Sequence, residues 1–499
     1  MVDRRLPVLV GSAQLLEREA DPAQALEPIA MLERVAREAA ADAGAAERML
    51  ADADTVCVVE VAGWYPQNAP QMLAERLGAA PVRQYVTGIG GELPLTAVNR
   101  IADEIVAGTT RVALIAGCNN LKTLERARKA RLKLDWATGG SSEPTMIGSR
   151  RHGSSEIEKA HGLATPPTVY PIFENALRAR RRLDLVAHRS HLGAMMSRFT
   201  EVASKNPYAW YPTARSPEEL TTPAPTNRMI AFPYTKYLNA VITTDQAAGV
   251  LLMSADAARS YGISEDRWVH WRGGARAAER AWYPGERADF ASCPALRAAT
   301  QGALARARLH TDDIDLIDFY SCFPVAVEMA CEMLEIDEAD PRGLTLTGGL
   351  PYFGGPANNY TLHSLATAFD RLRQGTGKTA LVTGNGWYLT KHAAVVLSKE
   401  APDGPLEAAD PVDVSSGPPP VEITAEARGR ATVETYTVLY ARDGAPERGV
   451  VIGRLQEGPR FIANTPDDRE ALESFVAVEN VGRSGSVRCE DGRNRFEPS

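Results

Sequence analysis

The chain has 499 residues, of which 44% are hydrophobic and 24% charged, and its formal net charge at pH 7 is −8. These proportions are typical of a globular protein, and at roughly 150 residues per domain the length allows about three domains. The acidic balance argues against a nucleic-acid partner, which requires a basic surface. The sequence carries no apolar run of membrane-spanning length and no secretory signal, so we expect a cytoplasmic protein without a membrane span. Six widely spaced cysteines predict reduced thiols, with neither a disulfide framework nor a metal site.

The first half of the chain contains a unit that recurs later. GTTRVALIAGCN begins at Gly108 and GTGKTALVTGNG begins at Gly375, and five of the twelve positions are identical at an offset of 267. Each run predicts a helix that ends at a glycine and is followed by a buried strand. Apolar residues at helical spacing precede both runs, and before each helix stands a loop rich in glycine and proline, GIGGELP or FGGPANN. We therefore predict an α/β fold of duplicated five-stranded layered units, at residues 1–120 plus 230–260 and at 261–400.

Residues 121–229 interrupt the repeat. They contain basic runs such as ERARKARLKLDW and RARRR, and proline-rich patches such as ATPPTVYP, with little strand signal. This composition predicts an inserted region of helices and loops.

Two further segments follow the second copy of the unit. Residues 401–420 are rich in proline, glycine and aspartate, which is typical of a linker. Beyond them, ATVETYTVLYARDGAPERGVVIGRL has the pattern strand, turn, strand. We predict a small β domain at residues 421–499.

This organisation resembles the thiolase superfamily, and in particular thiolase-like relatives of the sterol-carrier-protein-type thiolases. The similarity covers about residues 5–400 and is carried by IVAGTTRVALIAG, by RSHLGAMMSRF with NPYAW, and by YSCFPVAVEMACEML. The resemblance implies the layered αβαβα thiolase fold, an acyl-CoA thioester as substrate with no other cofactor, and a homodimer. A monomer is also compatible if the additional C-terminal domain covers the edge strand that precedes Gly91.

The C-terminal segment carries a second resemblance. ETYTVLYARDGAP followed by VVIGRLQEGPRFIAN looks like the OB-type β domain that partners some thiolase-like proteins, including retro-aldolases acting on acyl-CoA. Those partners usually carry a cysteine zinc ribbon. Only Cys489 lies beyond residue 400 in this chain, so we expect no ribbon.

The residues that perform thiolase catalysis are replaced here. The resemblance places Gly91, or a residue next to it, where the nucleophilic cysteine is expected. It places Gly355 where the catalytic histidine is expected, and Val382 where the second cysteine is expected. The motif Asn-Glu-Ala-Phe corresponds to YSCF, which begins at Tyr320. Glycine cannot transfer a proton, so the Claisen mechanism does not carry over.

The remaining polar residues define a predicted cleft, because ligands gather at the carboxyl ends of strands in layered α/β folds. The candidate catalytic residues are Tyr320, Cys322 and His363. The candidate substrate-binding residues are Gly91, Ser321, Gly354, Gly355, Asn358, Asn359 and Asn385. We expect free N–H groups of the Gly355 loop to meet the Tyr320 hydroxyl around one oxygen of the ligand.

Each candidate also has a structural interpretation. Cys322 is a nucleophile or a buried thiol that packs beside Phe323. Tyr320 is a donor to an oxyanion or a structurally hydrogen-bonded phenol. Asn358 faces the cleft or caps a helix.

Other polar residues in or near the repeat also have both a functional and a structural interpretation. Glu92 is a catalytic carboxylate or a complement to a helix dipole. Lys391 and His392 line the site or lie at the surface. The RARRR run contacts coenzyme A phosphates or forms a solvated helix face.

Three functions remain open from the sequence. The first is carbon–carbon bond cleavage of the retro-aldol type on an acyl-CoA, with Tyr320 as acid or base. The second is an acetyl-CoA acetyltransferase or other acyltransferase that uses Cys322. The third is a non-catalytic protein that binds acyl-CoA or lipid.

Overall fold

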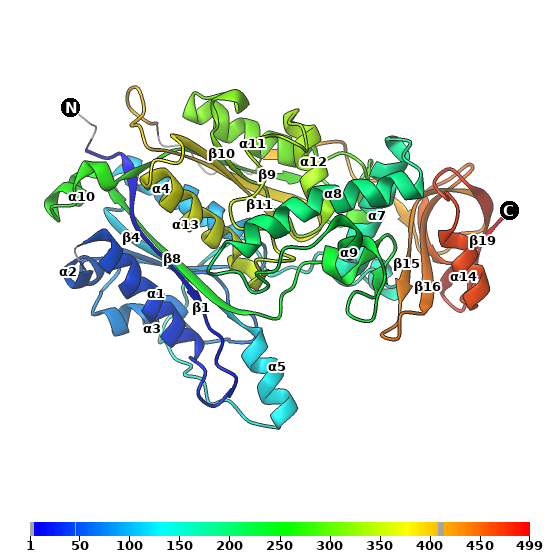
Figure 1. Cartoon of the computed structure of the whole chain (residues 1–499), viewed down its shortest axis with the longest axis horizontal. Coiled ribbons are helices and arrows are strands. Elements are labelled where there is room, and N and C mark those ends of the chain that lie inside the picture. Colours follow the sequence, from blue (N-terminus) through cyan, green and yellow to red (C-terminus); the bar gives the residue numbers. More distant parts are fainter. Residues whose placement is uncertain (1–3, 45, 408–413) are drawn as a thin grey trace.

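The first half of the molecule is a five-stranded sheet. The structure is a computed structural model that describes residues 4–44, 46–407 and 414–499 (Figure 1). The strands lie in the order β3 (Arg83–Thr87), β2 (Thr55–Val58), β4 (Val112–Asn120), β8 (Asp245–Ser254) and β1 (Pro7–Leu16). β2 is parallel to β3 and β4, whereas β8 is antiparallel to β4 and β1.

The second half repeats this order. β10 (Leu316–Asp318), β11 (Thr379–Gly386), β12 (Lys391–Ser398) and β9 (Val269–Glu279) are neighbours in that sequence. β10 is parallel to β11, and the other two pairs are antiparallel. Because β1 also pairs with β9 through Val8 and Leu9, the two halves join into one continuous path.

The second half differs from the prediction in having four strands on this path where the first half has five. The chain at Leu344 does lie beside β10, since its carbonyl accepts from the Phe319 N–H at 3.0 Å. The following N–H groups of Leu346 and Thr347 donate to the Asp318 carboxylate and not to a neighbouring backbone. A side chain therefore replaces the ladder that a fifth strand would need.

The duplication predicted from the sequence is confirmed. α4 (Leu93–Ala107) and α13 (Tyr360–Arg373) begin 267 residues apart and both belong to the middle layer, where they contact strands of both halves. Leu114 pairs with β2 and β8, and Leu381 pairs with β10 and β12, so the two leucines hold equivalent places.

The outer helices complete five layers, α-β-α-β-α. α1 (Pro28–Ala43) and α3 (Ala69–Leu77) cover the first half of the sheet, and α11 (Pro294–Ala307) and α12 (Pro324–Leu334) lie over the second half. Burial follows the amphipathic pattern, because the apolar face of each helix lies against its sheet.

The short helices α2 (Ala46–Ala51) and α10 (Ala255–Ser260) flank the first half. Single 3-10 turns occupy Lys236–Leu238, Glu265–Arg267, Pro284–Glu286, Thr311–Asp313 and Ala357–Asn359.

The inserted region is mainly helical, as expected, but it also contains strands. Its elements are α5 (Leu121–Ala130), β5 (Thr145–Ile147), α6 (Glu156–Ala160), α7 (Pro166–Arg180), α8 (Leu185–Ser204) and α9 (Pro217–Thr221). At its end and just beyond it, β6 (Met229–Ala231) and β7 (Tyr234–Thr235) pair with each other, and β6 also pairs with β15 (Gly429–Tyr440) of the C-terminal domain. β5 pairs with β3 and so covers the sheet edge before Gly91. The insertion, and not the C-terminal domain, protects this edge.

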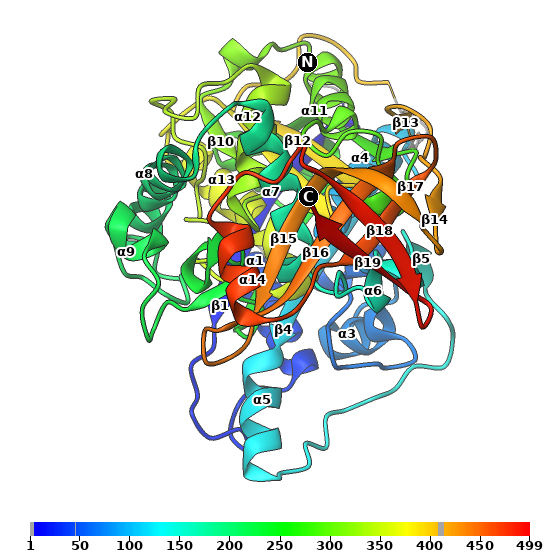
Figure 2. The same ribbon diagram turned by 90° about the vertical axis from the view of Figure 1, so that its right-hand side faces the viewer.

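The C-terminal domain is a closed, OB-like β-barrel, which faces the viewer in Figure 2. β15 (Gly429–Tyr440), β16 (Pro446–Leu455), β17 (Arg460–Asn464), β19 (Arg493–Pro498) and β18 (Ser484–Glu490) pair in that order, and β18 returns to β15. α14 (Arg469–Val476) connects β17 to β18.

The predicted linker, residues 401–420, is partly ordered: β13 (Val414–Ser416) adds to β9. Just after it, β14 (Ile423–Thr424) adds to β17 of the C-terminal domain. The rest of the linker includes residues 408–413, which lie outside the described residues.

The RARRR run joins the domains. Arg178 is buried and forms a bidentate ion pair with Glu479 of the barrel, at 2.6 and 3.0 Å. Arg181 binds acidic side chains that include Glu328 on α12. These two arginines therefore form neither a solvated face nor a free phosphate site, in contrast to both sequence interpretations. Within the described part of the chain, no helix combines the length and apolarity needed to cross a bilayer.

Candidate functional site

A cavity of about 510 Å³ opens where the two halves meet the insertion. Its walls come from the loop before α4, the turn between β10 and α12, the start of α7, and the end of β11. Six of the residues predicted from the sequence line it: Gly91, Tyr320, Cys322, Gly355, Asn358 and Asn385. The other walls are largely apolar, and include Pro166, Phe323 and Trp387.

The Tyr320 hydroxyl occupies the space beside Gly91. A β-carbon added at residue 91 would lie 2.3 Å from Tyr320 Oη, which is closer than any real contact. No hydrogen bond from this hydroxyl to protein is found among the described residues. The hydroxyl thus stands at the N-terminal end of α4, in the space that a side chain at residue 91 would take.

Tyr320 is a neutral phenol at pH 7. Burial raises its pKa well above the usual value, and the nearby Cys322, Tyr360 and Glu92 act in the same direction. The group can therefore donate a hydrogen bond or a proton to a ligand oxygen or carbon, and it does not carry a standing negative charge.

Cys322 is a buried thiol without an activating base. Burial raises its pKa to about 12, although Tyr170 and Asn385 oppose this shift by hydrogen bonding. The thiolate is the reactive form of cysteine, so this environment suppresses nucleophilic reactivity. Among the described residues that line the cavity, no carboxylate or imidazole is present.

A small network holds the floor of the cavity beside this thiol. Asn385 Nδ2 donates to the Tyr170 hydroxyl at 2.8 Å and approaches Cys322 Sγ at 3.8 Å. Tyr170 in turn donates to the Trp387 carbonyl at 2.8 Å and stacks on Phe323, with ring centroids 4.2 Å apart. Tyr170 and Trp387 were not predicted from the sequence, because they come from the insertion and from a turn outside the repeated segments.

The two asparagines before α13 tie the halves of the molecule together. Asn358 Oδ1 accepts from the Gly90 N–H and its Nδ2 donates to the Glu60 carbonyl, both at 3.0 Å. Asn359 Nδ2 donates to the Gly117 carbonyl at 2.8 Å and does not line the cavity. Neither side chain caps the helix, so the capping interpretation of Asn358 is wrong.

The glycines of the second loop do not provide the expected free donor. The Gly355 N–H donates to the Val241 carbonyl at 2.8 Å, so it is not available to a ligand. Gly354 has a φ of +109° and packs against Gln246 and Trp210, outside the lining of the cavity. The Gly355 N–H itself therefore does not meet Tyr320 around one oxygen of a ligand.

Two other predicted residues also lie away from the cavity. His363 is fully buried, contacts Gln14 Oε1 at 2.9 Å, and has a pKa lowered to about 3 by burial. Ser321 is fully buried beneath Gly349. The structure therefore gives His363 no contact with a ligand in this cavity.

The polar residues near the end of the second copy are buried and not at the surface. Lys391 Nζ lies 3.7 Å from the centroid of the Trp282 ring, and burial lowers its pKa to about 8. His392 Nε2 lies 3.2 Å from Cys293 Sγ. Glu92 is buried beside Gly90 and Gly386, outside the lining of the cavity.

The five layers and the sheet order define a thiolase-like fold. The structure matches the crystal structure of a monomeric SCP2-thiolase-like protein type 1 from Mycobacterium smegmatis with a TM-score of 0.83 and 34% identity, over 100% of both chains. Residues 413–492 match the family described as the thiolase-like protein type 1 additional C-terminal domain. This chain belongs to the SCP2-thiolase-like proteins of type 1.

Two more distant similarities are informative about the fold. An acetyl-CoA acetyltransferase of Methanothermobacter thermautotrophicus is 29% identical over 201 residues, which is 40% of this chain; the match spans about half, 49%, of that protein. The Ltp2-ChsH2(DUF35) aldolase matches with a TM-score of 0.61 and 17% identity, over 79% of this chain and 98% of that one.

Proposed function

We propose that the protein binds a β-hydroxyacyl thioester of coenzyme A in this cavity and cleaves its Cα–Cβ bond by a retro-aldol reaction, without an acyl-enzyme. The observation that carries this proposal is the position of the Tyr320 hydroxyl against Gly91. A phenol replaces the nucleophile, so the site offers a proton donor where a thiolase offers a thiolate.

A neutral phenol is sufficient because the reaction does not change the number of protons. As the Cα–Cβ bond breaks, its electron pair takes the Tyr320 proton at Cα, and the Tyr320 oxygen takes the β-hydroxyl proton in the same step. The products are a carbonyl compound and the shortened thioester, and Tyr320 ends the cycle as a neutral phenol.

Acyl transfer through Cys322 is less well supported. The thiol is neutral at pH 7 because burial raises its pKa, and it has no histidine among its contacts. The partial similarity to an acetyltransferase supports an acyl-CoA ligand in the broader sense. A second candidate is a non-catalytic acyl-CoA binder, which is favoured by the absence of a carboxylate or imidazole from the described lining.

The test uses the purified chain with a panel of β-hydroxyacyl-CoA thioesters. We expect release of an aldehyde or ketone together with a shortened acyl-CoA, and no mass increase on the protein. Tyr320→Phe should reduce turnover by roughly 10²–10⁴-fold, the range of general acid–base contributions, with little change in the affinity for coenzyme A. Cys322→Ser is the matched control and should retain turnover.

The outcomes separate the candidates. An adduct lost in Cys322→Ser would establish the acyltransferase and overturn the proposal. Binding of coenzyme A without turnover of any thioester would favour the binding protein.

We also propose that the chain is a monomer. β5 already pairs with β3, so the sheet edge that the resemblance assigned to a dimer interface has a partner within the chain. The M. smegmatis relative is described as monomeric. Light scattering that gives twice the mass of 53.9 kDa would contradict this.

A further inference from the structure

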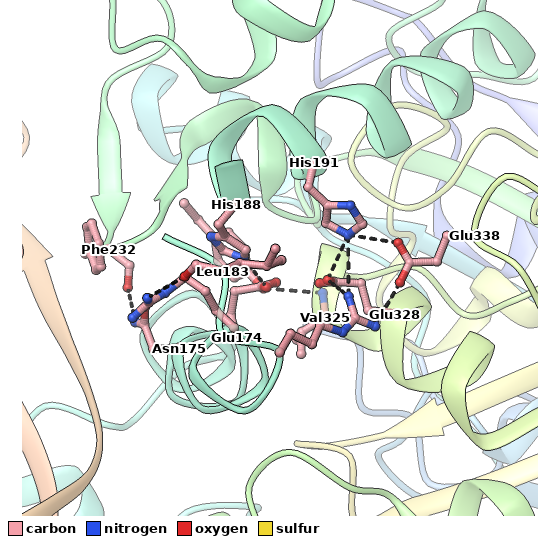
Figure 3. Close-up of polar contacts among 12 residues, drawn as sticks. Glu174, Asn175, Leu183, His188, His191, Phe232, Val325, Glu328 and Glu338 are labelled. Carbon is pink, nitrogen blue, oxygen red and sulfur yellow. Dashed lines mark hydrogen bonds and ion pairs between the residues drawn. The ribbon is translucent and has the colours of Figure 1, made fainter. Parts of the chain in front are cut away.

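Behind the cavity, three helices bring two carboxylates and an imidazole together (Figure 3). Glu174 lies on α7, His188 on α8 and Glu328 on α12, and all three are buried, with at most 2% of their surface exposed. One ligand atom from each lies within 4.8 Å of the others. This group, here called the α7–α8–α12 cluster, lies one helical turn beyond Tyr170 of the cavity.

The two oxygens of Glu328 have different surroundings. Oε1 accepts from Arg181 Nη1 at 2.7 Å and from His191 Nε2 at 3.2 Å. Oε2 is buried and has no hydrogen-bond partner among the described residues. A carboxylate oxygen of Glu328 also lies within 4.8 Å of one of Glu174. Two buried carboxylates this close are stabilised by a positive species between them, either a proton or a cation.

In a neighbouring group of the same residue types, an arginine side chain already balances the negative charge. His191, Glu328 and Glu338 also lie within 4.8 Å of one another. The guanidinium of Arg181 binds both of these glutamates, at 2.7 and 2.8 Å, and so supplies the positive charge there. No arginine or lysine ion pair with Glu174 is found in the described parts of the chain.

The α7–α8–α12 cluster has the ligand chemistry of a divalent cation of the zinc class. Zinc accepts histidine nitrogen and carboxylate oxygen, and three protein ligands leave a fourth position for water. His188 Nε2 and Glu174 Oε1 are 2.7 Å apart, whereas ligands of a tetrahedral zinc lie roughly 3.4 Å apart, so the site must widen by less than about 1 Å. The Tyr234 hydroxyl donates to Glu174 Oε2 at 2.6 Å and fixes this carboxylate from outside.

His188 presents Nε2 to the cluster, 2.7 Å from Glu174 Oε1, and metal binding requires this nitrogen to be without a proton. His188 also lines a surface pocket of about 190 Å³.

We propose that Glu174, His188 and Glu328 bind one divalent transition-metal cation, which holds α7, α8 and α12 together behind the cavity. The cation is structural, because the cluster does not line the cavity. The sequence did not indicate this site, since its residues lie 14 and 140 positions apart in the chain. The inference does not depend on the proposed retro-aldol activity.

The test uses the full chain, stripped with a chelator and titrated with Co²⁺ and Zn²⁺ alone. We expect one Co²⁺ per chain, with visible absorption of low coordination number, displacement by Zn²⁺, and a higher melting temperature with either ion. Glu174→Gln and His188→Gln should weaken Co²⁺ binding at least about 100-fold. Glu338→Gln, in the neighbouring group, is the matched control and should retain the stoichiometry.

Each outcome decides the proposal. A folded, stripped wild-type chain that binds no Co²⁺ or Zn²⁺ overturns it, and means that Glu174 and Glu328 share a proton. Undiminished binding in both cluster variants also overturns it. If the variants fail to fold, the wild-type stoichiometry and spectrum still decide, because they do not depend on any substitution.

Discussion

The loops that precede α4 and α13 are equivalent parts of the repeated unit, but they make different contacts. In the first copy, Gly91 has no side chain and the space beside it holds the Tyr320 hydroxyl, which faces the cavity. In the second copy, Asn358 and Asn359 use their amide groups to bind backbone of the first half. Duplication preserved the direction of both helices. The loop before the first helix faces the Tyr320 hydroxyl, and the loop before the second binds the two halves together through its asparagines.

The largest effect that we expect is on the rate of alkylation of Cys322. The proposed reaction at Tyr320 does not use this thiol. At pH 8, a thiol with a pKa of about 12 should react with iodoacetamide roughly 10³-fold more slowly than an ordinary thiol, because far less thiolate is present. The rate should rise about tenfold per pH unit as long as the protein stays folded. Mass spectrometry of the Cys322 peptide measures this rate.

The same peptide in urea provides the control for that experiment and should react at an ordinary rate. Fast labelling of the folded chain at pH 7 would instead show that Cys322 is an activated nucleophile, and would contradict the proposal that Tyr320 carries the reaction.

In the second loop, Asn358 should contribute more to the free energy of unfolding than Asn359. Asn358→Ala leaves the Gly90 N–H and the Glu60 carbonyl unpaired in a buried place, which should lower the free energy of unfolding by about 2–4 kcal/mol. Asn359→Ala removes one such bond and should cost about 1–2 kcal/mol. Urea denaturation of both variants measures the difference. Equal losses would show that the loop before α4 does not depend on Asn358.

Gly91 and Gly355, one in each of the two loops, should respond differently to the same substitution. Gly91→Ala places a methyl group 2.3 Å from Tyr320 Oη, so it should displace the phenol, destabilise the fold by about 1–3 kcal/mol and abolish any turnover. Gly355→Ala meets its nearest atom, Leu350 Cδ2, at 3.3 Å and should cost less than about 1 kcal/mol. Thermal unfolding and turnover of both variants test the comparison. A tolerated Gly91→Ala would mean that Tyr320 is not confined to this position.

The smallest expected effect concerns a bond between the two copies. Thr361 Oγ1 on α13 donates to the Gly91 carbonyl at 2.9 Å. Thr361→Val keeps the shape but removes this bond, and should lower the free energy of unfolding by about 1 kcal/mol. Thr361→Ser retains the hydroxyl, and its loss should be smaller than that of the valine variant. The reverse order in urea denaturation would assign the effect to packing of the methyl group.

The sequence predicted the fold better than it predicted the site. Apolar spacing and glycine stops located α4, α13 and the strands after them, because these signals depend on neighbours in the chain. The cavity depends on distant contacts. Tyr170 enters it from the insertion, whose path over the sheets no local pattern describes. His363 follows Tyr360 by one turn, and its side chain contacts Gln14 of β1, away from the cavity.

By itself, the sequence determined that the chain repeats a layered α/β unit and that glycines stand at residues 91 and 355 in the loops before the two repeated helices. A glycine indicates that another group packs closely against the backbone. It does not indicate which group this is, because the neighbour lies far away in the chain. Only the tertiary structure decided that the Tyr320 hydroxyl takes the space at Gly91, and that the Gly355 N–H is held by the Val241 carbonyl. Only packing of α7, α8 and α12 brought Glu174, His188 and Glu328 into one buried cluster, since burial and proximity arise when helices meet.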